Sequence, residues 1–166
     1  VVAEDPELLE ALVQEFGQGI RAADGGLDRA ALGKIVFADD GARARLEALT
    51  HPAIIARARR ELEALRGEGA PVIYEAALLV ETGRYQELDL LVVVVANMEV
   101  RRERLIQRDG LTPAEAEQRF AAQLPQEEKA ALADHVIDNS GPLQQTREQV
   151  EKIWRVLAVK RKRHER

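Results

Sequence analysis

The 166-residue sequence contains no cysteine, which excludes a disulfide framework, a cysteine-ligated zinc site and a thiol nucleophile. Its longest apolar run, residues 90–96, is far shorter than the roughly 20 residues that a membrane helix needs. The chain shows no signal peptide, so a cytoplasmic protein is expected. Basic residues are in deficit, with 24 Lys and Arg against 29 Asp and Glu, and the net charge of −5 argues against a general nucleic-acid binder.

Methionine is scarce as well: it occurs once, at Met98, and the chain begins with Val1. A natural product starts with methionine unless it is processed. We therefore expect that a segment preceding Val1 is missing from this sequence.

Common phosphate-binding and metal-binding motifs are also absent. A Walker loop, G-x-x-x-x-G-K-[ST], would need a serine or threonine after Gly33-Lys34, and Ile35 stands there. The chain has no G-x-G-x-x-G fingerprint. No metal site is predicted, because the histidines lack metal-ligand spacing; they are His51, His135 and His164.

Helix signals dominate the first 67 residues. Asp5-Pro6 places a capping side chain before a proline, and apolar residues follow at helical spacing. Asp28 is expected to cap a short helix through Ile35, and Asp39 or its neighbour to cap the next one.

His51-Pro52 predicts a break in this helical region, because the residue before a proline is pushed out of the helical conformation. A further helix is expected from Pro52 to about residue 66. The first 67 residues therefore predict a region made of helices alone.

The pattern changes after residue 70, where strands and helices alternate. The run 71–79 begins with β-branched residues, and 89–96 holds four consecutive valines, which favours a strand covered on both faces in a parallel sheet. A charged helix over 99–108 and a capping box at Thr112–Glu115 follow. A strand over 135–138 and a last helix from about 142 complete an α/β pattern.

Arginine is the residue type that points to chemistry. Arg101, Arg104 and Arg108 share one face of the predicted helix, and Arg119 lies on the next helix. Two such helices could close over phosphates with bidentate hydrogen bonds. The alternative is a solvated face whose arginines pair with nearby glutamates.

Two further features have a functional and a structural interpretation. Glu75 is expected at or near the end of the strand over 71–76, where parallel sheets place ligand sites, so it could hold magnesium or a water. It could equally be a strand-end acid paired with a lysine or arginine. The basic tail 160–163 is typical of a solvated helix end, although it could contact nucleic acid or an acidic surface.

Segments along nearly the whole chain together resemble the dephospho-coenzyme A kinase family. The RDGL…R…Q…EEK stretch followed by VIDNSG is the most specific part. In order, the segments are LDRAALGKIVFAD (27–39), LEALTHP (46–52), ALLVETG (77–83), RLIQRDGLTPAEAEQRFAAQLPQEEK (104–129) and ADHVIDNSG (133–141).

The resemblance implies a function and a fold. The function is the magnesium- and ATP-dependent transfer of the γ-phosphoryl group to the ribose 3′-hydroxyl of dephospho-CoA, the last step of coenzyme A synthesis. The fold is a P-loop kinase-like three-layer α/β fold with a parallel sheet. Residues 1–67 would be the helical acceptor-binding region, and 68–166 the remaining core with a helical lid at about 104–129. Dephospho-CoA and ATP are the implied partners, with no nucleic acid and no membrane, and the oligomeric state is left open.

The resemblance also implies roles for individual residues. Arg108 and Arg119 match the lid arginines that would meet the phosphates, and are the predicted catalytic residues. Asn139 would lie near the adenine of ATP. The predicted substrate-binding residues are Phe37, His51, Glu75, Leu78, Leu79 and Glu81. The chain departs from the family pattern at Glu75, Ala77 and Val80, which would alter the acceptor pocket.

The family's phosphate loop and first two strands have no counterpart in these 166 residues. We therefore expect this chain to be inactive alone, and a dephospho-CoA-binding module without turnover is the alternative. The strand over 71–76 should share no ladder hydrogen bonds with the strand over 89–95, because the missing first strand would lie between them. Arg108 and Arg119 are expected to be exposed on one concave surface that faces the strand ends.

Overall fold

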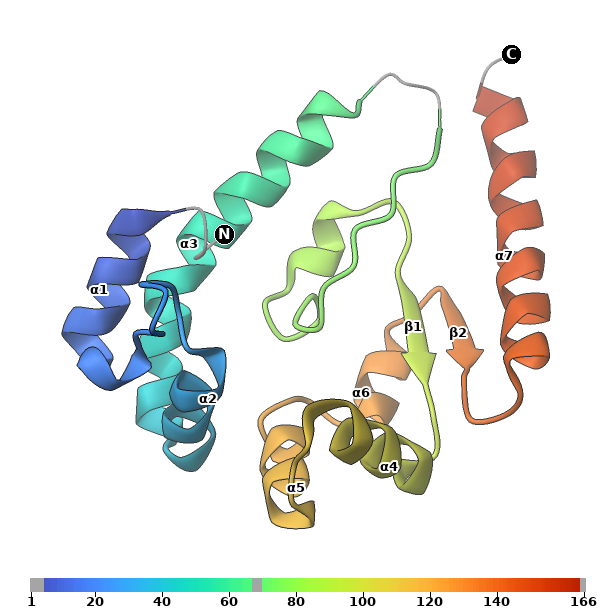
Figure 1. Ribbon diagram of the computed structural model, residues 1–166. Helices are drawn as coiled ribbons and strands as arrows, with labels where there is room; N and C mark the ends of the chain where they lie inside the picture. The colour runs from blue at the N-terminus through green and yellow to red at the C-terminus, as the bar shows by residue number, and fades with distance from the viewer. Residues whose placement is uncertain (1–4, 67–69, 165–166) are drawn as a thin grey trace. The chain divides into compact units, whose positions relative to one another are not determined.

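In the first part of the structure, aspartate side chains cap the N-termini of the helices. The structure, a computed structural model, describes residues 5–66 and 70–164. It divides into two compact units, Val1–Glu75 (unit 1) and Ala76–Arg166 (unit 2). Unit 1 contains α1 (Pro6–Phe16), the short 3₁₀ helix η2 (Gln18–Ile20), α2 (Arg29–Ala38) and α3 (Asp40–Ala64) (Figure 1).

All the predicted caps are present. The Asp5 carboxylate accepts a hydrogen bond from the Leu8 backbone N–H at 3.0 Å. Asp28 caps α2 and Asp39 caps α3 in the same way, so Asp39 rather than its neighbour is the cap. Helix α2 continues three residues beyond Ile35, its predicted end.

The core of unit 1 forms where α1, α2 and α3 meet. Leu12 and Ile20 are fully buried in it. The other buried members are Leu8, Val13, Leu32, Val36 and Ala42. Burial of this apolar surface is what stabilises helices that would be marginal in isolation.

The predicted break at His51-Pro52 is wrong, because α3 runs through both residues without interruption. Pro52 removes one helical hydrogen bond. However, Leu49 and Ala53, on either side of it, both pack against the core of unit 1. We infer that this packing outweighs the local cost of the proline and keeps the two halves in one helix.

Residues 71–76 form no strand, so this prediction is also wrong. Ile73 is 82% exposed and Glu75 is exposed, which removes the premise that Glu75 ends a buried strand. A strand needs a neighbouring strand for its backbone N–H and C=O groups, and within residues 5–66 and 70–164 the strand pairs and isolated bridges do not include this segment. The prediction about ladder hydrogen bonds between 72–75 and 92–95 presupposed a strand over 71–76 and therefore has no basis in this structure.

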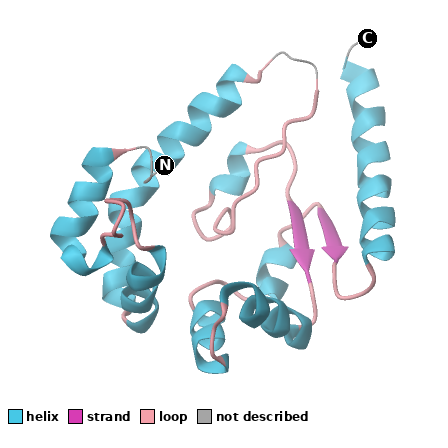
Figure 2. Ribbon diagram, viewed as in Figure 1, coloured by secondary structure: helices cyan, strands magenta, loops and turns pink. Residues whose placement is uncertain are grey.

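Unit 2 is built on a pair of parallel strands, as the α/β prediction requires. Strand β1 (Val92–Val95) pairs with β2 (His135–Asp138), with Val92 opposite His135 and Val95 opposite Asp138. Both arrowheads lie at the same end (Figure 1), and Figure 2 shows the helices around the pair. The helical elements are η3 (Arg84–Glu87), α4 (Met98–Asp109), α5 (Pro113–Ala121), α6 (Gln126–Ala131) and α7 (Leu143–His164).

The four valines of β1 are not covered on both faces, contrary to the prediction. Val94 is 57% exposed, whereas Leu91 and Ala96, which flank the strand, are buried. Helix α6 contacts β1 and α7 contacts β2, and these contacts leave the face at Val94 open. Within residues 5–66 and 70–164, every helix is too short or too polar to span a bilayer.

Candidate active site

The loops that follow the two strands are tied together at the carboxyl edge of the sheet. The Asn97 backbone N–H, after β1, donates to Ser140 Oγ, after β2, at 2.8 Å. Ser140 in turn donates from its hydroxyl and from its backbone N–H to Asp138 Oδ1. These two hydrogen bonds hold the pKa of the Asp138 carboxyl below its usual value, and the one from the Ser140 hydroxyl has the larger effect. This edge of the sheet is therefore fixed by polar contacts.

Asn139, the predicted ATP-binding residue, is held at this edge by several partners. Its backbone N–H donates to the Val95 carbonyl at 2.8 Å. Its backbone carbonyl accepts from Arg104 Nη1 at 2.9 Å. Its side-chain Oδ1 accepts from Thr146 Oγ1 at 3.0 Å. Asn139 thus connects the strand end to helices α4 and α7.

Helix α5 and the second half of α4 lie within the predicted lid, and the two helices form a cross-linked hairpin. Gly110, with φ +66°, ends α4, and the predicted capping box of Thr112 and Glu115 starts α5. Arg102 Nε lies 2.7 Å from Glu117 Oε1. The residues between the helix ends therefore turn the chain sharply and place arginine side chains from α4 beside α5.

The three arginines on the predicted face of α4 contact different partners. Arg101 stacks with its guanidinium carbon 4.8 Å from the Phe120 ring centre. Arg104 reaches the loop after β2, and Arg108 pairs with Asp109. These three side chains thus contact an aromatic ring, a backbone carbonyl and an aspartate, respectively.

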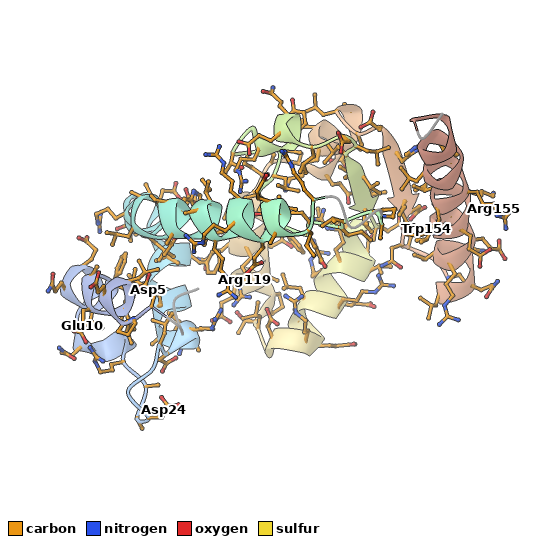
Figure 3. All side chains as sticks on the ribbon, turned by 90° about the horizontal axis from the view of Figure 1, so that it is seen from above. Asp5, Glu10, Asp24, Arg119, Trp154 and Arg155 are labelled. Atoms are coloured by element: carbon orange, nitrogen blue, oxygen red, sulfur yellow. The ribbon has the colours of Figure 1, made fainter. Side chains whose placement is uncertain are left out.

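Arg108 and Arg119 converge on the carboxylate of Asp109. Arg108 Nε lies 2.7 Å from Asp109 Oδ1, and Arg119 Nη1 lies 2.5 Å from Asp109 Oδ2. The hydrogen bonds with Arg108 are the largest cause that lowers the pKa of the Asp109 carboxyl, and the same contact raises the pKa of the Arg108 guanidinium. The Arg108 side chain is 73% exposed, as predicted, but Arg119 (Figure 3) is only 29% exposed.

Glu81 forms a largely buried ion pair with Lys129. Glu81 Oε1 lies 2.5 Å from Lys129 Nζ, and the side chains are 18% and 13% exposed. Glu81 Oε1 also accepts from the Leu124 backbone N–H. Lys129 Nζ donates at 3.1 Å to both the Ala77 carbonyl and Gln123 Oε1. The pair and its hydrogen bonds therefore join the segment after residue 76 to α6 and to the linker between α5 and α6.

The remaining predicted site residues are divided between the units. Phe37 on α2 is half-buried and packs against the core of unit 1, and His51 on α3 is half-buried. Glu75 is the last residue of unit 1. Leu78 and Leu79, in unit 2, are half-buried in a turn. Their roles in acceptor binding stay predictions.

A family model described as dephospho-CoA kinase matches residues 1–145 of this sequence. The chain belongs to this family. Two curated dephospho-CoA kinases are each 50% identical to it. The Symbiobacterium thermophilum protein aligns over 89% of this chain and 62% of its own length, and the Geobacter sulfurreducens protein over 87% and 74%. The chain thus spans about 62% of the length of the Symbiobacterium relative.

Solved structures also resemble the fold. A crystal structure from Thermus thermophilus has a TM-score of 0.70 and 35% identity, and covers 95% of this chain and 78% of its own. A dephospho-CoA kinase from Campylobacter jejuni has a TM-score of 0.64 and 29% identity, with 94% and 78% coverage. The predicted membership of the dephospho-CoA kinase family and the predicted α/β class with a parallel sheet are confirmed.

Sequence reasoning missed the partners of the predicted site residues in this dephospho-CoA kinase family member. Asp109 stands next to Arg108 in the RDGL motif, and an acid adjacent to a predicted phosphate ligand was the available signal. Lys129 ends the quoted stretch 104–129, but its partner Glu81 lies far away in the sequence. No local pattern connects two such residues.

Proposed function

We propose that this chain supplies the acceptor-binding region and the lid for phosphoryl transfer from ATP to the ribose 3′-hydroxyl of dephospho-CoA. Residues 1–67 form the acceptor region in this proposal, and residues 104–129 form the lid. Family membership supports the reaction. The observation that carries the proposal is the convergence of Arg108 and Arg119, from two helices, on one anionic group.

The chemistry suits these side chains. Phosphoryl transfer leaves little covalent work for a protein, which must neutralise charge on the equatorial oxygens and exclude water. A guanidinium group offers a planar fork of donors that matches two phosphate oxygens. Arg108 and Arg119 already surround a carboxylate, so the same pair can surround a phosphate group, which carries a larger negative charge.

The adenine and acceptor ends have their own candidates. Asn139 is positioned by Thr146 and Arg104, and we assign it to the adenine of ATP. Phe37 and His51 are assigned to the acceptor in unit 1. The acceptor-side residues of the following segment are Glu75, Leu78, Leu79 and Glu81.

Magnesium is expected with ATP in a kinase, and it would neutralise phosphate charge. Within the described residues, no group of three or more His, Cys, Asp or Glu side chains is placed to hold a metal ion. The described residues therefore offer no metal site built from three or more such side chains, whereas magnesium in a kinase is held by one or two carboxylates together with the phosphates of the substrate.

The alternative is a module that binds dephospho-CoA without turnover. This alternative does not require the G-x-x-x-x-G-K-[ST] motif, whose backbone would cradle the phosphates of ATP and which does not occur within the 166 residues. The two functions differ in a measurable product, because only the first converts dephospho-CoA to CoA.

Calorimetry and a turnover assay test the proposal. We expect the chain to bind dephospho-CoA, and Arg108→Ala or Arg119→Ala to weaken ATP binding roughly tenfold, the scale of a charge-assisted hydrogen bond. Arg155→Ala is the matched control, because Arg155 is exposed on α7 and forms an ion pair with Glu151, one turn earlier in the same helix. CoA formation by a chain supplied with an upstream G-x-x-x-x-G-K-[ST] loop separates the kinase from the binding module, because the 166 residues alone are expected to be inactive. Failure to bind either ligand would reject both.

A further inference from the structure

The carboxylate of Asp109 occupies the edge of Arg108 that phosphate would use. Asp109 Oδ1 accepts from Arg108 Nε at 2.7 Å, and Oδ2 accepts from Arg108 Nη2 at 3.1 Å. These two parallel hydrogen bonds are the bidentate arrangement through which arginine binds carboxylate or phosphate. The same Oδ2 also accepts from Arg119 Nη1. One carboxylate thus holds both predicted lid arginines.

The position of Asp109 in the helix needs an explanation. Asp109 is the last residue of α4, and Gly110 follows as its left-handed cap. A negative charge in the last turn lies beside the negative end of the helix dipole, so an unpaired aspartate there is unfavourable. The two guanidinium groups offset this effect. Asp109 is therefore best understood together with the arginines that it contacts.

We propose that Asp109 is the resting counter-ion of the lid and competes with ligand phosphate for the bidentate edge of Arg108. This inference rests on the proposed function of Arg108 and Arg119. In the free chain, Asp109 holds both arginines near one point. When phosphate binds, Arg108 exchanges the two carboxylate oxygens for two phosphate oxygens. The Arg108 side chain is 73% exposed, so this exchange needs only a rotation in solvent.

The same hairpin offers a matched control. Glu117 on α5 pairs with Arg102 on α4 at 2.7 Å, and these side chains are 53% and 36% exposed. Glu117→Gln removes the same unit of negative charge from the same helix pair as Asp109→Asn. It leaves the contacts of Arg108 unchanged. The comparison therefore separates competition at Arg108 from a general gain in positive charge.

In the experiment, the full 166-residue chain is titrated with inorganic tripolyphosphate, and the arginine Nε–Hε signals are followed by NMR. The shifts of these signals give the dissociation constant even when binding is weak. We expect Asp109→Asn to bind tripolyphosphate about two- to fivefold more tightly than the unchanged chain, the range of an exposed ion pair. Asp109→Ser should do the same, and Glu117→Gln should leave the dissociation constant unchanged. Backbone spectra verify that each variant is folded.

Contrary outcomes have distinct meanings. If Asp109→Asn and Asp109→Ser bind equally well or more weakly than the unchanged chain, while Arg108→Ala still loses affinity, the competition is refuted and the proposed role of Arg108 stands. An equal gain in Glu117→Gln refutes it as well. If Arg108→Ala and Arg119→Ala both bind tripolyphosphate normally, the proposed function itself is wrong, and the competition with it.

Discussion

Replacing Lys129 with methionine should destabilise unit 2 far more than the loss of a surface ion pair would. The three protons of the Lys129 ammonium group have acceptors on Glu81, Ala77 and Gln123. Removing one partner of a buried pair costs about 3–5 kcal/mol, because the other charge stays buried. Both side chains keep some solvent contact, 13% and 18%, so we expect the lower end, about 3 kcal/mol.

Urea unfolding measures this loss. Trp154 is the sole tryptophan and lies on α7 in unit 2, so its fluorescence reports on that unit (Figure 3). With a slope of about 2 kcal/mol per molar urea, the midpoint should fall by about 1.5 M. Lys152→Met, at an exposed position on α7, is the matched control and should change the stability by less than about 0.5 kcal/mol.

A second variant tests the cause of the loss. Glu81→Met added to Lys129→Met removes the stranded charge, so the pair of substitutions should recover most of the lost stability. A loss of less than about 1 kcal/mol in Lys129→Met alone, the value of a surface pair, would refute the reasoning. So would a double variant that is less stable than the single one.

Other predictions concern the lid and the first unit. In a chain supplied with an upstream G-x-x-x-x-G-K-[ST] loop, Arg119→Ala should lower kcat more than it raises KM for dephospho-CoA. The reason is that the phosphate charge that Arg119 meets develops mainly in the transition state. A change in KM alone would contradict this role. Asp5→Ala should cost unit 1 about 1 kcal/mol in thermal unfolding, since Leu8 loses its cap. In the folded chain, the pKa of the Asp109 carboxyl is below its ordinary value of 3.8. The pairing of Asp109 therefore stabilises the fold above that pH, and this stabilisation is lost as the pH falls through the folded pKa. Carboxyl NMR should show that Arg108→Ala raises the pKa of Asp109.

The sequence predicted structure correctly where the interaction joins residues that are close together in the sequence. Asp5, Asp28 and Asp39 cap their helices, and the capping box of Thr112 and Glu115 starts α5. In each case the side chain satisfies a backbone N–H within three residues of itself. Such a contact depends on neither the other helices nor the rest of the chain.

Predictions that needed distant partners were less reliable. The strand over 71–76 required a neighbouring strand, which the described residues do not provide. The break at Pro52 ignored the core contacts of Leu49 and Ala53. Both errors came from judging a segment by its own residues, whereas packing or pairing with other segments decides its structure.

In the candidate site too, distant parts of the chain determine the contacts, and a shared helix face does not predict what each side chain contacts. Helical spacing correctly aligned Arg101, Arg104 and Arg108 along α4. Yet the first stacks on a ring of α5, the second reaches the loop after β2, and the third pairs with Asp109 beside it. A common face sets the direction in which side chains leave the helix, but the neighbouring elements determine what each side chain meets. Arg108 shares its partner Asp109 with Arg119 of the next helix, which is why the phosphate proposal rests on Arg108 and Arg119 rather than on the whole face.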